Sequence, residues 1–184
     1  MFERAGMQNT GKAVKLAAAA AKEHNITHIV VASTVGDSAR EALAAAQKAG
    51  LKLVVVTHSS SFKEANGLQE FDPALREEIE KAGHRVHTGV HVLRGLGRAI
   101  KDKVGWSDED VVAHTLRIFG QGMKVCVEIV AMAVDAGLVP CPGNVVAVAG
   151  TARGADTVII ASTAPSHKLF DIKIRHIVAK PFNF

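Results

Sequence analysis

The stretch Val30-Val31-Ala32-Ser33-Thr34-Val35-Gly36-Asp37-Ser38-Ala39-Arg40 decides the expected fold. Its first residues are apolar and β-branched, which is typical of a buried strand, and an alanine-rich helical segment follows the glycine. A strand that turns directly into a helix is the repeating unit of a parallel α/β sheet. The turn at residues 33–40 is therefore the starting point for both the fold and a candidate site.

This turn suits the capture of a small anion, above all a phosphate group. The first N–H groups of a helix have no partner inside the helix and lie at the positive end of its dipole. Hydroxyl groups add donors, glycine lets the backbone approach a ligand, and arginine supplies a planar cation. The candidate anion-binding residues are Ser33, Thr34, Gly36, Asp37, Ser38, Ala39 and Arg40. The alternative is a structural turn in which Ser38 only caps the helix and Arg40 is only solvated.

The rest of the chain alternates strand and helix patterns. Strands are expected at 28–32, 51–57, 84–87, 145–149 and 157–162, with a half-buried, antiparallel edge strand over 170–180. Helices are expected at 10–22, 38–49, 73–82, 98–104 and from 107 to about 136, with a break at 120–122, whereas 89–97 reads as a loop. This order predicts one three-layer α/β/α domain over residues 1–184, built on a mainly parallel sheet.

Composition narrows the function classes. With 184 residues, 48% of them hydrophobic, the chain can bury a sizeable core, and no apolar run is long enough to span a membrane. The start of the chain lacks the order of a signal peptide, so a cytoplasmic location is the default expectation. The net charge of +4 is spread without a dense basic run and the chain has no tyrosine, which argues against nucleic-acid binding. Self-association is permitted but not required.

Neither cysteines nor histidines predict a metal site. Cys126 lies in an apolar helical pattern and Cys141 in a turn, and neither has a partner at metal-ligand spacing. The histidines at 58, 87, 91 and 114 do not follow the spacing of a zinc motif. We therefore expect no metal.

Further candidates follow the other strands, because ligands of open α/β sheets bind beyond the carboxyl ends of the strands. Thr57 and His58 end one strand, and Gly150, Thr151 and Arg153 follow another. Together with the 33–40 turn they would build one crevice. The alternatives are a solvated loop after His58 and a tight connection between two strands at 150–156.

A final candidate group lies at the start of an apolar helical run. Gly122 could expose fresh N–H groups, while Lys124 and Glu128 are four residues apart and share a helix face. Glu128 stands among apolar residues, so its burial would be costly without a partner. It either accepts hydrogen bonds from ligand hydroxyls or simply pairs with a nearby cation.

The chain resembles a known family of proteins. Three stretches are similar to shared features of small, stand-alone, mostly archaeal proteins with the pyruvate kinase C-terminal-domain-like fold. They are Val30–Ser33, Gly120–Ile129 (GQGMKVCVEI) and Gly154–Thr157. The equivalent loop of full pyruvate kinases holds a phosphate of a sugar-bisphosphate activator in many members. The small relatives look like FMN binders, with no reaction firmly attached. The resemblance does not imply pyruvate kinase activity, since the catalytic barrel is absent.

The resemblance implies FMN as the cofactor, with its phosphate on the 33–40 turn and a flavin ring N–H as a donor to Glu128. The favoured interpretation is a module that binds a phosphorylated small molecule without a defined reaction. The alternatives are an oxidoreductase that uses bound FMN and a regulatory domain that binds a sugar phosphate. The sequence offers only Glu128 and His58 as acid–base groups near the expected site, which favours binding alone.

Overall fold

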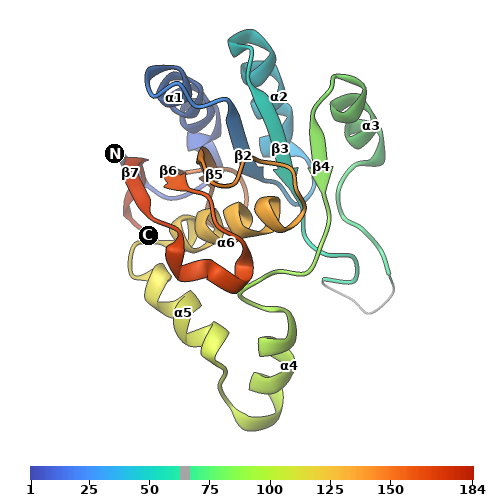
Figure 1. The fold of residues 1–184 in the computed structure, drawn as a ribbon, viewed down its shortest axis with the longest axis vertical. Helices are drawn as coiled ribbons and strands as arrows, with labels where there is room; N and C mark the ends of the chain where they lie inside the picture. Colours follow the sequence, from blue (N-terminus) through green and yellow to red (C-terminus); the bar gives the residue numbers. More distant parts are fainter. Residues whose placement is uncertain (63–66) are drawn as a thin grey trace.

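A six-stranded sheet forms the middle of the molecule, with helices on both of its faces (Figure 1). The structure, a computed structural model, describes residues 1–62 and 67–184. The sheet order is β4-β3-β2-β5-β6-β7, with strands β2 (His28–Ala32), β3 (Lys52–Val56), β4 (Arg85–His87), β5 (Asn144–Ala149), β6 (Thr157–Ser162) and β7 (Ile174–Ala179). The pairs β2–β3, β3–β4 and β2–β5 are parallel, which confirms the mainly parallel α/β fold.

The two faces of the sheet carry two separate apolar cores. Helices α1 (Thr10–Glu23), α2 (Asp37–Ala49) and α3 (Pro73–Lys81) cover one face, and α6 (Gln121–Asp135) covers the other. Successive side chains of a strand point to opposite faces, so Val31 packs toward α1–α3 and Val30 toward α6. This arrangement confirms the expected three layers.

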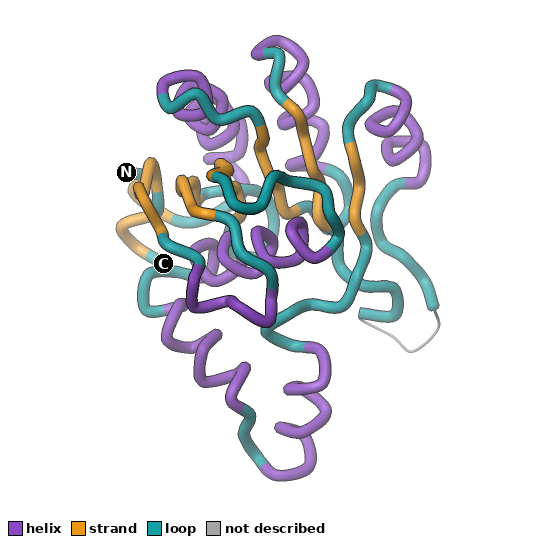
Figure 2. The backbone as a smooth tube through the Cα atoms, viewed as in Figure 1, coloured by secondary structure: helices purple, strands orange, loops and turns teal. Residues whose placement is uncertain are grey.

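The far side of the sheet departs from the parallel pattern. Strand β6 runs antiparallel to β5, and β7 runs antiparallel to β6 at the sheet edge, as expected for the last strand. The expected start of that strand is too early, because Ser166–Asp171 forms a 3-10 helix and β7 begins only at Ile174. The sequence patterns also missed β1 (Phe2–Arg4) and β8 (Pro181–Asn183), whose parallel pairing brings the two chain ends together (Figure 2).

Two helices, α4 (Gly95–Val104) and α5 (Asp108–Arg117), project from the body of the domain (Figure 1). The prediction of a loop through residue 97 was wrong, because α4 already begins at Gly95. The expected break at 120–122 separates α5 from α6, and Gly120 there has a φ of 114°, which favours glycine. Within the described ranges, no helix has the length and apolar character needed to cross a membrane.

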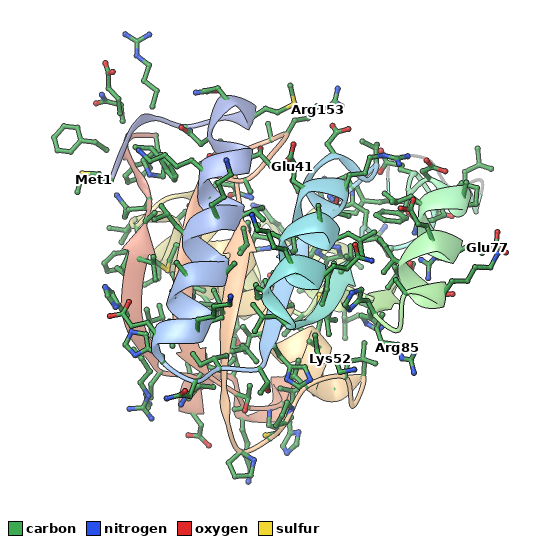
Figure 3. The ribbon with its side chains drawn as sticks, turned by 90° about the horizontal axis from the view of Figure 1, so that it is seen from above. Met1, Glu41, Lys52, Glu77, Arg85 and Arg153 are labelled. Carbon is green, nitrogen blue, oxygen red and sulfur yellow. The ribbon has the colours of Figure 1, made fainter. Side chains whose placement is uncertain are left out.

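The carboxyl ends of β2, β3 and β5 lie at one end of the sheet, since these strands are parallel. Figure 3 shows this polarity: Arg153, beyond the end of β5, lies away from Lys52 and Arg85, the first residues of β3 and β4. The site is built at the carboxyl end.

Candidate functional site

A cavity of about 510 Å³ opens at the carboxyl ends of β2, β3 and β5, between the sheet, α6 and the α4–α5 pair. Its volume lies in the range of small-molecule sites. The sequence-predicted residues that line it are Ser33, Thr34, Asp37, Ser38, Thr57, His58, Lys124, Glu128, Gly150 and Arg153. The three strand ends therefore share one crevice, as their positions in the sequence suggested.

The β2–α2 turn has the geometry of a tight loop into a helix. Helix α2 begins at Asp37 with Gly36 as its N-cap, so Ser38 is a buried residue of the first turn and does not cap the helix. The Ser33 hydroxyl accepts a hydrogen bond from the Ala39 N–H at 3.3 Å, which places Ala39 behind the cavity wall. Gly36 has a φ of 121°, and a Cβ there would meet Leu75 at 2.6 Å. The glycine is thus required by the turn itself.

Arg40 is not brought to the cavity. Its guanidinium pairs with Asp72 at 2.6 Å on the surface, and its side chain is 57% exposed. The first turn of α2 directs position 40 toward α3, away from the strand ends. Arg153 instead reaches the turn, where it forms an ion pair with Asp37.

The loop at 150–156 is mainly held by its own contacts. Asp156 is fully buried, and its carboxylate accepts hydrogen bonds from the N–H groups of Gly6 and Thr151 and from the Thr157 hydroxyl. A Cβ on Gly150 would meet the backbone of Ala155 at 2.9 Å, which is the tight connection considered from the sequence. Thr151 does not line the cavity, whereas Gly150 and Arg153 do.

Helix α6 presents a buried ion pair to the cavity. Lys124 Nζ donates to Glu128 Oε2 at 2.5 Å, and their side chains are only 7% and 1% exposed. Glu128 Oε1 also accepts from the Leu93 N–H at 2.9 Å, and its Oε2 lies 3.3 Å from His91 Nδ1. Burial raises the pKa of Glu128, but the His91 hydrogen bond and the Lys124 charge outweigh it and hold the pKa at about 2. The carboxylate is thus charged and already satisfied.

Gly122, the remaining α6 candidate, serves packing. It does not line the cavity, and a Cβ there would collide with the side chain of Thr157 on β6. The glycine allows α6 to lie close against the sheet.

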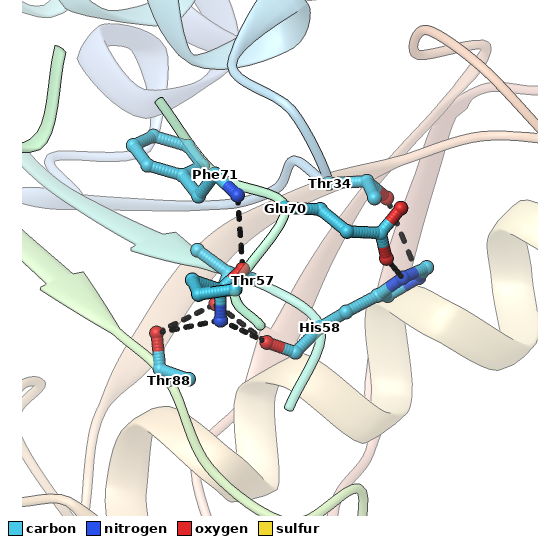
Figure 4. A network of polar contacts seen from close by, with 7 residues as sticks. Thr34, Thr57, His58, Glu70, Phe71 and Thr88 are labelled. Atoms are coloured by element: carbon cyan, nitrogen blue, oxygen red, sulfur yellow. Dashed lines mark hydrogen bonds and ion pairs between the residues drawn. The ribbon is translucent and has the colours of Figure 1, made fainter. Parts of the chain in front are cut away.

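His58 is held in a polar network that joins the ends of β2 and β3 to residues 69 and 70 (Figure 4). His58 Nδ1 lies 3.1 Å from Glu70 Oε2, and His58 Nε2 lies 3.3 Å from Thr34 Oγ1. The Thr57 hydroxyl and Gln69 Nε2 both donate to the His58 carbonyl at 2.8 Å. Thr57 therefore fixes the backbone of its neighbour, and His58 presents its ring to the cavity.

The sequence reasoning missed most of the positive charge around the cavity. Arg98 and Lys101 line it from α4, Arg94 lines it from the residue just before α4, and Arg117 lines it from the end of α5. Arg98 and Lys101 are three residues apart in the helix expected at 98–104, which places both side chains on one helix face, a signal that the sequence did carry. What the spacing could not show is that this face turns toward the strand ends.

Other reactive groups lie elsewhere or are inert. In the two ranges that the structure describes, no group of three or more His, Cys, Asp or Glu side chains is arranged to hold a metal ion. Cys126 is buried, and burial raises the pKa of its thiol, whereas Cys141 is exposed and lies away from the cavity lining.

The family described as pyruvate kinase, alpha/beta domain, matches residues 12–161, and the chain belongs to this family. Among solved structures, the chain is similar to a pyruvate kinase from Cryptosporidium parvum, with 13% identity and a TM-score of 0.46 over 84% of this chain and 23% of that one. It is also similar to a T.th. threonine deaminase, with 21% identity and a TM-score of 0.30 over 71% of this chain and 39% of that one. The chain thus spans well under half of either solved chain.

Proposed function

We propose that the cavity binds a phosphorylated small molecule, with FMN as the first ligand to test. The observation that carries the proposal is the excess of positive charge in the cavity. Its lining includes the cations Arg94, Arg98, Lys101, Arg117, Lys124 and Arg153, against the carboxylates of Asp37, Asp110 and Glu128. An anionic ligand would balance this excess.

The carboxylates of the lining do not neutralise all of its cations. Asp37, Asp110 and Glu128 are each paired with one cation of the lining, namely Arg153, Lys101 and Lys124. Arg98 pairs with Asp102.

Two arginines of the lining remain without a carboxylate partner in the part of the chain that the structure describes. Arg94 lies 4.2 Å over the Phe62 ring, and Arg117 Nε donates to Gln121 at 2.7 Å. Burial, together with the charges of Arg117 and Arg94, lowers the pKa of Lys124 against the pull of Glu128. Mutual repulsion of this kind is relieved when an anion enters.

The β2–α2 turn is the proposed phosphate subsite. The N–H groups at the start of α2 and the hydroxyls of Ser33 and Ser38 are donors at the cavity wall. Arg153 takes the role that the sequence suggested for Arg40, because it lines the cavity beside Asp37.

His91 offers a hydrogen-bond acceptor for the part of the ligand that lies beyond its phosphate. Its Nδ1 is within hydrogen-bond distance of the Glu128 carboxylate, which can only accept, so Nδ1 donates and Nε2 of the neutral ring is an acceptor. Nε2 is buried and has no partner among the described residues, although His91 lines the cavity. A ring N–H, such as the one in the flavin pyrimidine, fits this acceptor. When bound, FMN supplies redox chemistry, and these residues bind and orient it.

Absorbance titration of the purified protein with FMN tests the proposal. Saturable binding is expected, weakened by about 1.5–3 kcal/mol in Arg117→Ala, the range for a hydrogen bond to a charged group. Arg40→Ala is the matched control, since Arg40 lies outside the cavity, and its affinity should equal that of the unmodified protein.

The possible outcomes distinguish an error in the identity of the ligand from an error in the location of the site. Failure to bind FMN, together with saturable binding of a sugar phosphate that Arg117→Ala weakens, would replace FMN by that ligand class. Binding of FMN that responds equally to Arg40→Ala and Arg117→Ala would contradict the assignment of this cavity.

A further inference from the structure

A hydroxyl and a carboxylate both contact one imidazole, that of His58, beside the cavity (Figure 4). Thr34 Oγ1 is 3.3 Å from His58 Nε2, and His58 Nδ1 is 3.1 Å from Glu70 Oε2. These are the two ring nitrogens that face the nucleophile and the carboxylate in hydrolases with a catalytic triad. Hydroxyl-to-base distances slightly above 3.2 Å are common in such sites before substrate binds.

The carboxylate fixes where the protons lie. Glu70 in its ionised form can only accept, so His58 Nδ1 carries the ring proton and donates it. Nε2 of the neutral ring is then an acceptor, and the Thr34 hydroxyl donates to it. Thr34 is thereby hydrogen-bonded to a base that is ready to take its proton.

The imidazole is held in this orientation from several sides. Phe62 stacks on the His58 ring with centroids 3.8 Å apart, and the His58 carbonyl accepts from Thr57 and Gln69. We call the hydrogen-bonded group Thr34–His58–Glu70 the relay. Thr34 and His58 both line the cavity, so the relay is open to a ligand at its hydroxyl end.

We propose that Thr34 is an activated nucleophile, with His58 as its general base and Glu70 as the group that orients His58, and that the cavity transfers acyl groups from carboxylic esters that carry an anionic group. The anionic group follows from the cationic lining described above. The relay itself does not require FMN to be the ligand.

The proposed reaction balances with water as the only co-reactant. His58 Nε2 takes the Thr34 proton as Oγ1 forms a bond to the carbonyl carbon, and the bond to the leaving oxygen breaks as that oxygen receives the proton. Water then attacks the acyl-threonine with its proton passing to His58, and the acid leaves as Thr34 recovers its hydroxyl. Helix α2 begins three residues after Thr34, so the N–H groups at its start are the backbone donors proposed for the developing oxyanion.

The charged surroundings of His58 favour its role as a base. Burial lowers the pKa of its imidazole below 6.5, and the positive charge of Arg94 lowers it further against the opposing effect of Glu70. His58 is therefore neutral near pH 7. The reaction rate should rise with pH and level off with a midpoint below 6.5.

Hydrolysis of p-nitrophenyl acetate, followed by release of p-nitrophenolate, tests the proposal on the full chain. We expect a burst of product and an acetyl group on Thr34, located by mass spectrometry of peptides. Thr34→Val and His58→Gln should each lower the rate at least about 100-fold, the low end for general base catalysis. Thr34→Ser, which keeps the hydroxyl, should retain the burst.

Thr27→Val is the matched control, because Thr27 Oγ1 also contacts an imidazole, His28 Nδ1 at 2.8 Å, but on the exposed surface. Its rate should equal that of the unmodified protein. Equal rates for Thr34→Val and the unmodified protein, or acetylation at other residues only, would overturn the proposal. The FMN titration is independent of this result, so failure of one proposal leaves the other testable.

Discussion

Lys124→Met should destabilise the fold by about 3 kcal/mol, because it removes one partner of a buried ion pair. Lys124 Nζ and Glu128 Oε2 are 2.5 Å apart, and the side chains are 7% and 1% exposed. Removing one member of such a pair costs about 3–5 kcal/mol, since the remaining charge is left buried. We expect the lower end, because Glu128 keeps His91 and the Leu93 N–H.

The free energy of unfolding at low pH provides a second measure of the Lys124–Glu128 ion pair. The pKa of Glu128 falls from 4.5 in the unfolded chain to about 2 in the fold, which corresponds to roughly 3 kcal/mol. Because the folded value is the lower one, this stabilisation is full above 4.5 and is lost as the pH falls toward 2. Glu128→Gln lacks the titrating group, so its deficit against the unmodified protein should shrink over this interval.

Urea unfolding followed by circular dichroism measures both effects. The matched control is Lys81→Met, because Lys81 and Glu77 form an ion pair of the same spacing at 2.7 Å with side chains 73% and 66% exposed. An exposed pair of this kind contributes about 0.3–0.5 kcal/mol. If Lys124→Met were as mild as Lys81→Met, the carboxylate of Glu128 would have to be satisfied without Lys124, and the argument from burial would fail.

Two further predictions concern local geometry and are measured by thermal unfolding. Gly122→Ala should destabilise the fold by about 1–3 kcal/mol, because the added Cβ meets Thr157. In α1, the Cβ of Gly11→Ala would only make ordinary van der Waals contact with Glu41 at 3.8 Å, so this change should be neutral or stabilising. An equal response at the two glycines would contradict the close packing of α6. Ser107→Ala should cost about 1 kcal/mol, because the Ser107 hydroxyl caps α5 by accepting from the Asp110 N–H at 3.2 Å; an unchanged Tm would show that the cap adds nothing.

The strand ends of the site could be predicted because their signals are local. An apolar run followed by hydroxyls and a glycine identifies the end of β2, and the same reasoning applies to Thr57 and Gly150. Parallel pairing then brings these ends together without any knowledge of side-chain contacts.

The partners of individual side chains could not be predicted, because they depend on contacts between distant segments. Arg40 suits a phosphate by its chemistry, yet Asp72 on another element binds it. Glu70 forms no recognisable motif with His58, twelve residues before it, and only the structure shows that the two side chains meet. Gly122 was predicted to expose N–H groups at a helix start, and its role in packing follows only from the position of Thr157.

The departure from a parallel sheet also shapes the site. Because β6 is antiparallel to β5, the chain returns at the carboxyl end through the short 150–156 loop, and Arg153 reaches Asp37 there. A parallel neighbour would instead need a long crossover at this point. The strand ends therefore supply hydroxyls and backbone N–H groups, while α4, the end of α5 and α6 supply most of the cations. It follows that substitutions in α4 can change which anion is bound without disturbing the relay at Thr34, so charge selection and the proposed reaction should be separable by mutation.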